Sequence, residues 1–217
     1  MANTVIEDLS APGMTDVRRA RLLLERAGHT CVLCRGDKVY ADDRAGIAPM
    51  MGFIGAGVDL RGFSAADRIV GRAAALLFVL AGVREVYSAV MSKGGAEVLE
   101  AHGIAHSCTT LTERIINRTG TGICPMEQAV TGIDDPHAAY EAIAATLERL
   151  RAQAAGQGAA IGGAAGMDGG AADGTAGKSS GNAHGQAVDD SGMSNAATGA
   201  RGDAECKGRS ATAAQEG

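Results

Sequence analysis

Residues 64–91 read SAADRIVGRAAALLFVLAGVREVYSAVM, and this stretch decides the expected fold. Ser64 and Asp67 have the S-x-x-D spacing of a capping box, which satisfies the first free N–H groups of a helix. The residues that follow are apolar almost all round and stop at a glycine, which predicts a helix over residues 65–81 that is covered on every side. Residues 83–91 then predict a strand.

The segments downstream repeat this order of elements. Residues 95–102 predict a helix that a glycine ends, and residues 104–108 predict a second strand. A helix–strand–helix–strand order with short loops predicts parallel strand pairing, with helices on the faces of the sheet. The expected fold class is therefore α/β.

The other segments predict shorter elements. Residues 46–57 predict a loop with an apolar turn of undecided type, and residues 111–116 are ambiguous. Gly71 would lie inside the helix expected over residues 65–81, where a glycine usually marks the close approach of a neighbour. The remaining expected elements are a helix over 15–27, a hairpin over 29–41, a short helix over 125–130 and a final helix over 136–150.

The composition divides the chain into a domain and a tail. Of the 32 glycines, 16 lie in residues 151–217, which hold no aromatic residue and no leucine. Such a segment buries too little apolar surface to offset the entropy of ordering its backbone. We therefore expect a flexible N-terminus over residues 1–13, one domain over residues 14–150 and a disordered Gly/Ala-rich tail over residues 151–217.

Charge and hydropathy argue against two kinds of partner. The net charge is −5 and neither the domain nor the tail is basic, which argues against strong nucleic-acid binding. The longest apolar run, residues 73–83, is shorter than the roughly 20 residues that a bilayer requires, so no membrane contact is expected. The first 13 residues lack the pattern of a signal peptide, and five irregularly spaced cysteines suit a reducing compartment. These features predict a cytoplasmic protein and leave its oligomeric state open.

The pair Cys31 and Cys34 has the C-x-x-C spacing of a metal or redox motif. In a strand, residues three apart face opposite sides of the sheet, so the two thiols cannot bind one ion. We expect two small, half-buried strand residues instead.

The most informative stretch for chemistry is INRTGTGICPME, residues 116–127. Pro125 suits the first position of a helix, which places Cys124 at the N-cap and Glu127 in the acidic position of a capping box. A thiol at a helix N-terminus lies at the positive end of the helix dipole, which favours the thiolate. Cys124 and Glu127 are therefore the candidate catalytic residues, as nucleophile or acid/base.

The residues before this helix form a candidate anion site. Flexible glycines that precede a helix N-terminus expose main-chain N–H groups, an arrangement typical of phosphate binding. The spacing matches neither the P-loop nor the dinucleotide fingerprint, so an ordinary turn before a capped helix, with an inert Cys124, is the alternative. Asp67 has a second role open to it as a capping acid. The candidate ligand-binding residues are Asp67, Asn117, Arg118, Thr119, Gly120, Thr121 and Gly122.

Three stretches carry a resemblance to a known family. DRIVGRAAALLFVLAGVREVY (67–87), IINRTGTGICPMEQAV (115–130) and DDPHAAY (134–140) resemble the domain of unknown function 1893. The resemblance covers roughly residues 14–150 and leaves out the tail. It implies a three-layer cytidine-deaminase-like fold, a mixed sheet with helices on both faces, and it implies no assigned biochemical role.

The zinc-binding residues of a deaminase are missing from this sequence. A zinc deaminase needs a His or Cys two residues before a catalytic Glu at one helix start, and a P-C-x-x-C pair at another. The helix expected at Asp67 has neither group, and the one at Pro125 has a reversed Cys-Pro order and a single thiol. One thiol cannot hold Zn²⁺ in a three-ligand site, so we expect no zinc and assign no cofactor or other metal.

Two functions are compatible with these residues. The first is binding of a nucleotide or other phosphorylated small molecule at the Asn117–Glu127 loop and helix start, with or without catalysis. The second is a non-catalytic interaction or regulatory module with an inactive pocket, because a fold does not imply an activity. The sequence leaves both open.

Overall fold

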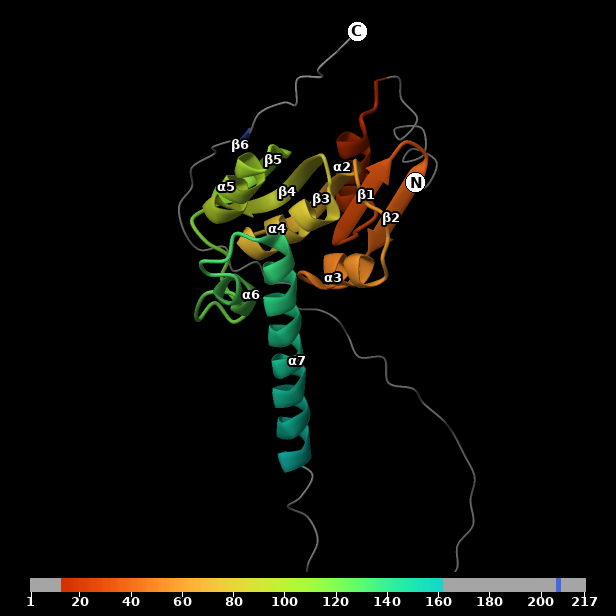
Figure 1. Cartoon of the computed structure of the whole chain (residues 1–217). Helices are drawn as coiled ribbons and strands as arrows, with labels where there is room; N and C mark the ends of the chain where they lie inside the picture. The colour runs from red at the N-terminus through yellow and green to blue at the C-terminus, as the bar shows by residue number, and fades with distance from the viewer. Residues whose placement is uncertain (1–12, 162–205, 208–217) are drawn as a thin grey trace, which may run out of the picture. The chain divides into compact units, whose positions relative to one another are not determined.

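A mixed sheet organises the chain, which we describe from a computed structural model (Figure 1). The structure describes residues 13–161 and 206–207, so all but the last residue of the flexible segment expected over residues 1–13 and most of the expected tail lie outside the described residues. The strand order is β2-β1-β3-β4-β5-β6. The strands are β1 (Cys31–Arg35), β2 (Lys38–Asp42), β3 (Ser64–Val70), β4 (Glu85–Ser92), β5 (Ala105–Thr112) and β6 (Cys206–Lys207).

The pairing of the strands is parallel in the centre of the sheet and antiparallel at its sides. Strands β3, β4 and β5 are parallel neighbours, whereas β1 pairs antiparallel with both β2 and β3. The short strand β6 pairs antiparallel with β5. The β1–β2 hairpin turns at Gly36, whose φ of 53° suits a residue without a Cβ. The α/β class and the parallel pairing expected from the order of elements are therefore confirmed.

Three helices have nearly the bounds that the sequence predicts, and two others differ from the prediction. Helices α2, α5 and α6 lie within two residues of their expected bounds, and α3 shows that the undecided apolar turn is helical. Helix α7 continues past its expected end at Leu150, and the chain divides into two units between Arg149 and Leu150. In the part of the chain that the structure describes, no helix is long and apolar enough to cross a membrane. The helices are α2 (Asp16–Arg26), α3 (Ala48–Gly55), α4 (Arg72–Ala81), α5 (Lys93–Ala101), α6 (Pro125–Ala129) and α7 (Pro136–Ile161).

Helices cover both faces of the sheet, as expected. On one face, Ala20 and Leu24 of α2 pack against Val32 of β1 and Ala66 of β3. The larger core lies on the other face, under α3, α4, α5 and α6 and the first part of α7. Its largest fully buried side chains include Leu33, Met50, Leu60, Phe63, Leu76, Leu77, Phe78, Met91, Leu99 and Ile143.

The two cysteines of β1 separate the two cores. Cys31 lies in the larger core and Cys34 in the smaller one, and neither is exposed to solvent. The expectation that their thiols face opposite sides of the sheet is confirmed. Their burial is complete rather than partial, because both faces of β1 are covered.

The helix predicted over residues 65–81 is wrong in its first half. Ser64–Val70 form strand β3, and only Arg72–Ala81 form helix α4. A strand covered on both faces and a buried helix share the same continuous apolar pattern, so periodicity does not distinguish them. Gly71 is the N-cap of α4 and not an interior residue of a helix. The capping box at Ser64 and Asp67, and the helix start expected at Asp67, are therefore wrong as well.

Candidate functional site

The parallel strands end at one edge of the sheet, and two helices begin there. Strand β3 ends at Val70 and α4 begins at Arg72, while β4 ends at Ser92 and α5 begins at Lys93. Ligands of α/β proteins generally bind outside the carboxyl ends of parallel strands. We call this region, the ends of β3, β4 and β5 with the starts of α4 and α5, the carboxyl edge.

The Glu127 carboxylate occupies the start of α4. Its Oε2 accepts a hydrogen bond from the main-chain N–H of Arg72 at 2.9 Å, and its Oε1 accepts one from Ala73 at 3.0 Å. These N–H groups have no partner within their own helix and lie at the positive end of its dipole, so a carboxylate is stabilised there. A Cβ on Gly71 would lie 2.4 Å from Oε1 of Glu127, so only glycine leaves room for this contact. Glu127 therefore caps a helix other than its own.

The side chain of Arg72 makes a second contact with the same part of the chain. Its guanidinium donates to the carbonyl oxygen of Ile133 at 2.7 Å and forms an ion pair with Asp134. Its Nε is buried and has no hydrogen-bond partner among the described residues. Arg72 also lines a hollow of about 250 Å³ between α4 and α5, together with Leu76, Glu97, Val98, Ala101, His102 and Asp134.

The start of α5 is closely packed against the start of α4. The Ser92 hydroxyl accepts a hydrogen bond from the N–H of Gly95 at 3.1 Å, which caps α5. A Cβ on Gly95 would lie 2.9 Å from the carbonyl oxygen of Val70, so this glycine permits the close approach of β3. Lys93 forms an ion pair with Glu113, which follows β5.

The expected anion loop is closed by its own side chains. Asn117 Oδ1 accepts hydrogen bonds from the hydroxyl of Thr119 and the main-chain N–H of Thr121, each at 3.0 Å, and Asn117 Nδ2 donates to the Thr121 hydroxyl at 3.1 Å. The main-chain N–H of Gly120 donates to the carbonyl oxygen of Asn117. Two of the N–H groups expected to bind phosphate are therefore already used. Arg118 is exposed, and the structure shows no ion pair for it among the described residues.

Cys124 lies at the N-cap of α6, as the sequence predicts, and is half-buried against the larger core. Its side chain makes no capping hydrogen bond, while its N–H donates to the carbonyl oxygen of Ile115 at 3.0 Å. Helix α6 has only five residues. Asn117, Cys124 and Glu127 lie on the segment between β5 and α7, and Glu127 joins this segment to the carboxyl edge.

Asp67 is separated from this segment. It lies inside β3, where its Oδ1 accepts the N–H of Ile69 at 3.0 Å and its carboxyl group is hydrogen-bonded to the Cys31 thiol. Burial raises the pKa of Asp67 to about 7, although the hydrogen bonds from Ile69 and Cys31 act in the opposite direction. Burial also raises the pKa of the Cys31 thiol well above its usual range, and the nearby Asp67 charge adds to this effect. The pair therefore resembles a buried donor and acceptor more than an activated nucleophile.

A row of polar side chains crosses the sheet at Asp67. Cys31 is the register partner of Asp67, which is the partner of Ser88. Beyond this row the alternation of faces shifts: Ala65 and Val70 both lie in the larger core, although they are five residues apart. Strands β4 and β5 show the same shift. The side chains of Asp67 and Ser88 each form a hydrogen bond with the main chain two residues further along their own strand. The sequence offers no periodic signal for this row, because a local shift in alternation is set by pairing between strands.

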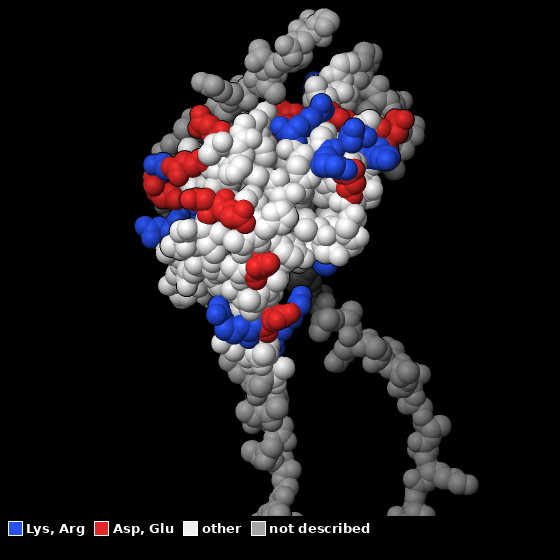
Figure 2. Space-filling model, in the orientation of Figure 1, with Lys and Arg blue, Asp and Glu red and all other residues white. Residues whose placement is uncertain are grey.

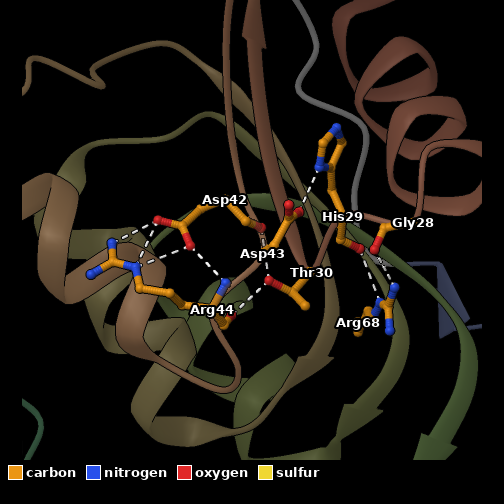
Figure 3. Close-up of polar contacts among 7 residues, drawn as sticks. All are labelled: Gly28, His29, Thr30, Asp42, Asp43, Arg44 and Arg68. Carbon is orange, nitrogen blue, oxygen red and sulfur yellow. Dashed lines mark hydrogen bonds and ion pairs between the residues drawn. The ribbon is translucent and has the colours of Figure 1, made fainter. Parts of the chain in front are cut away.

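A polar cluster links β2 to the start of β1, as Figure 3 shows. The Thr30 hydroxyl shares its one proton between the carbonyl oxygens of Asp42 at 2.8 Å and Arg44 at 2.7 Å. The Arg44 guanidinium pairs with the Asp42 carboxylate and holds its pKa below the usual range. Arg68 of β3 donates from Nε to the carbonyl oxygen of His29 at 2.9 Å. The cluster joins β1, β2 and β3, so its role is structural.

The face shown in Figure 2 has charged groups of both signs around a largely uncharged centre. The described residues on this face therefore form no continuous basic stripe. In the described ranges, no three His, Cys, Asp or Glu side chains are grouped so that they could hold a metal ion.

Comparisons with known proteins identify a family. The model of the domain of unknown function DUF1893 matches residues 19–147. A crystal structure of a DUF1893 family protein from Thermotoga maritima is similar, with a TM-score of 0.55 and 22% identity over 63% of this chain and 91% of that one. No curated protein sequence matches the chain. Since the family model spans more than half of the sequence, the chain belongs to the DUF1893 family.

Proposed function

We propose that this protein binds a nucleotide or another small phosphorylated molecule at the carboxyl edge, through the segment from Asn117 to Glu127. The observation that carries the proposal is the loop that Asn117 closes. Its internal hydrogen bonds fix the main chain and leave the guanidinium of Arg118 exposed and without an ion-pair partner among the described residues. An exposed guanidinium on a fixed main chain suits a phosphate group, because its N–H donors match the phosphate oxygens in pairs.

Several residues of the segment have distinct roles in this proposal. Arg118 supplies the charge, and the hydroxyls of Thr119 and Thr121, which lie 2.7 Å apart, supply exchangeable hydrogen bonds. Glu127 positions the segment through its contact with α4. Catalysis by Cys124 or Glu127 stays a prediction, as does the cytidine-deaminase-like character of the fold, which the mixed sheet with helices on both faces supports.

The experiment is a thermal-shift and calorimetric panel of nucleoside mono-, di- and triphosphates and sugar phosphates. We expect at least one compound to raise the midpoint of unfolding, and Arg118→Ala to remove that shift without lowering the midpoint of the free protein. Arg114→Ala is the matched control, because Arg114 is also exposed and lies just before the proposed binding segment. A shift that persists in Arg118→Ala, or one lost equally in Arg114→Ala, would contradict the proposed site.

A different observation favours the interaction module. Ile69, Ile116 and Ile123 are exposed by 51%, 46% and 39%, and all three lie on the carboxyl edge or on the segment that follows β5. Ile116 and Ile123 are partners in a β-bridge and so lie side by side, and adjacent exposed apolar residues often mark a protein-binding surface. If this function is correct, the nucleotide panel gives no shift, and Ile116→Asp weakens concentration-dependent association in sedimentation velocity.

A further inference from the structure

Residues 113–134 cross the carboxyl edge between β5 and α7, and we call them the strap. Of these residues, only Met126 and Val130 are buried. Many of the strap's hydrogen bonds are internal: Cys124 to Ile115, Asn117 to Gly122, and Ile133 to Val130. A segment with few buried side chains and self-contained hydrogen bonds belongs to the least stable part of a fold, and it can open while the core stays closed.

Three polar ties join the strap to the rest of the domain. Lys93 pairs with Glu113 at one end, and the Arg72 side chain binds Ile133 and Asp134 at the other. Between these two ends of the strap, the Glu127 carboxylate accepts hydrogen bonds from two N–H groups at the start of α4. The two end ties involve exposed partners, since the Glu113 and Asp134 side chains are exposed by 72% and 91%. Ion pairs of that kind contribute little to stability, so the half-buried Glu127 contact is the strongest of the three.

We propose that the strap opens as a unit over the carboxyl edge, with the Glu127 carboxylate as the clasp that holds it closed. This inference rests on the proposed function in one respect, that the strap carries the residues proposed to bind the ligand. The clasp itself depends only on contacts within the chain. Met126 and Val130 also hold the strap to the larger core. Removing the Glu127 charge, or displacing its carboxylate, therefore makes the strap open more often without disturbing the sheet.

Two substitutions test the clasp by different means. Glu127→Gln keeps the size of the side chain and removes its charge. Its single amide oxygen can accept only one of the two N–H groups, so one hydrogen bond is lost and the other is weakened. Gly71→Ala leaves the charge in place but puts a Cβ where the carboxylate lies, 2.4 to 2.8 Å from its three terminal atoms. Gly94→Ala is the matched control, since its Cβ would meet only Arg72 Cβ at an ordinary 3.8 Å.

The measurement is hydrogen exchange of the full chain followed by mass spectrometry of peptides. We expect amides in residues 113–134 to exchange about tenfold faster in Glu127→Gln and Gly71→Ala, as the loss of a charge-assisted hydrogen bond implies. Amides of β3, β4 and β5 should keep the wild-type rate, and Gly94→Ala should match the wild type throughout. Equal strap rates in the wild type and Glu127→Gln would overturn the proposal, as would faster exchange spread evenly over the domain. If Gly71→Ala does not fold, Glu127→Gln alone decides.

A second measurement separates this inference from the proposed function. Hydrogen exchange is repeated with any nucleotide that the thermal-shift panel identifies, or with adenosine monophosphate if none is identified. Faster strap exchange in the variants with no response to nucleotide supports the clasp and contradicts the proposed ligand. A nucleotide response with unchanged strap exchange in both variants supports the ligand and overturns the clasp.

Discussion

Replacing Asp67 with asparagine is predicted to remove much of the pH dependence of the free energy of unfolding between pH 5 and 8.5. The Asp67 carboxyl is buried in β3, and burial raises its pKa from an ordinary value near 3.8 to about 7. Because the folded pKa lies above the unfolded one, the native state binds the proton more tightly than the unfolded state does. The contribution of Asp67 to stability is therefore greatest at the acid end of this range, falls as the pH rises towards 7, and is constant above it.

The size of the effect follows from the two pKa values. One pKa unit corresponds to about 1.4 kcal/mol, so the full window from about pH 4 to pH 7 spans about 4 kcal/mol. Between pH 5 and 8.5 the wild type should lose about 3 kcal/mol through this group. In Asp67→Asn this loss disappears, because an amide does not titrate and still accepts the N–H of Ile69 through its oxygen.

Urea unfolding at half-unit steps of pH measures the effect, with the result read as the difference between variant and wild type. Taking the difference removes the contribution of Glu85, whose pKa burial also raises. Asp59→Asn is the control: Arg61 holds the pKa of Asp59 at about 2, so this exposed carboxyl does not titrate in the range. If Asp67→Asn and the wild type show the same slope against pH, the carboxyl is ionised at pH 5 and the burial argument fails.

Three further predictions concern the core, a helix end and the thiols. Phe78→Ala should lower the free energy of unfolding by about 3–5 kcal/mol in urea titrations, because it leaves a cavity at a fully buried site; a loss below 1 kcal/mol would contradict this packing. Gly82→Ala should cost about 1–2 kcal/mol, because Gly82 ends α4 with a φ of 69°; a neutral effect would exclude that conformation. In native protein, iodoacetamide should label half-buried Cys124 before fully buried Cys31, as peptide mass spectrometry can show. Equal labelling of the two would mean that β1 is open.

The parts of the fold that depend on local signals could be predicted from the sequence. Helix α5 and the hairpin of β1 and β2 follow from amphipathic periods and from glycines at their ends or turns. The parallel pairing of β4 and β5 follows from a helix that connects two strands. In each case the deciding contacts lie within about twenty residues along the chain.

Strand β3 could not be predicted in the same way. Its residues are buried on both faces of the sheet, so they lack the alternation that marks a half-exposed strand. The S-x-x-D spacing at Ser64 then suggested a cap that the strand does not use. The same error placed Asp67 at a helix start, although it lies in a strand with Cys31 as its register partner. The polar row across β1, β3 and β4 depends on pairing between strands, and the sequence alone does not fix that pairing.

Glu127 shows most clearly why the candidate site was predicted only in part. Its spacing from Cys124 correctly indicates a helix start, and the local pattern predicts that the carboxylate caps that helix. In the structure it caps α4 instead. The two N–H groups that it accepts belong to residues 55 and 54 positions earlier in the sequence. The signal for this contact was Gly71, a residue that tolerates close approach, followed by a helix with no acidic residue in its first turn. A helix start with neither an acid in its first turn nor a side-chain cap leaves its N–H groups free for an acceptor from elsewhere, and a neighbouring glycine leaves the space for one. Taken together, those two features indicate a distant carboxylate or a bound anion, and here the chain supplies the carboxylate itself.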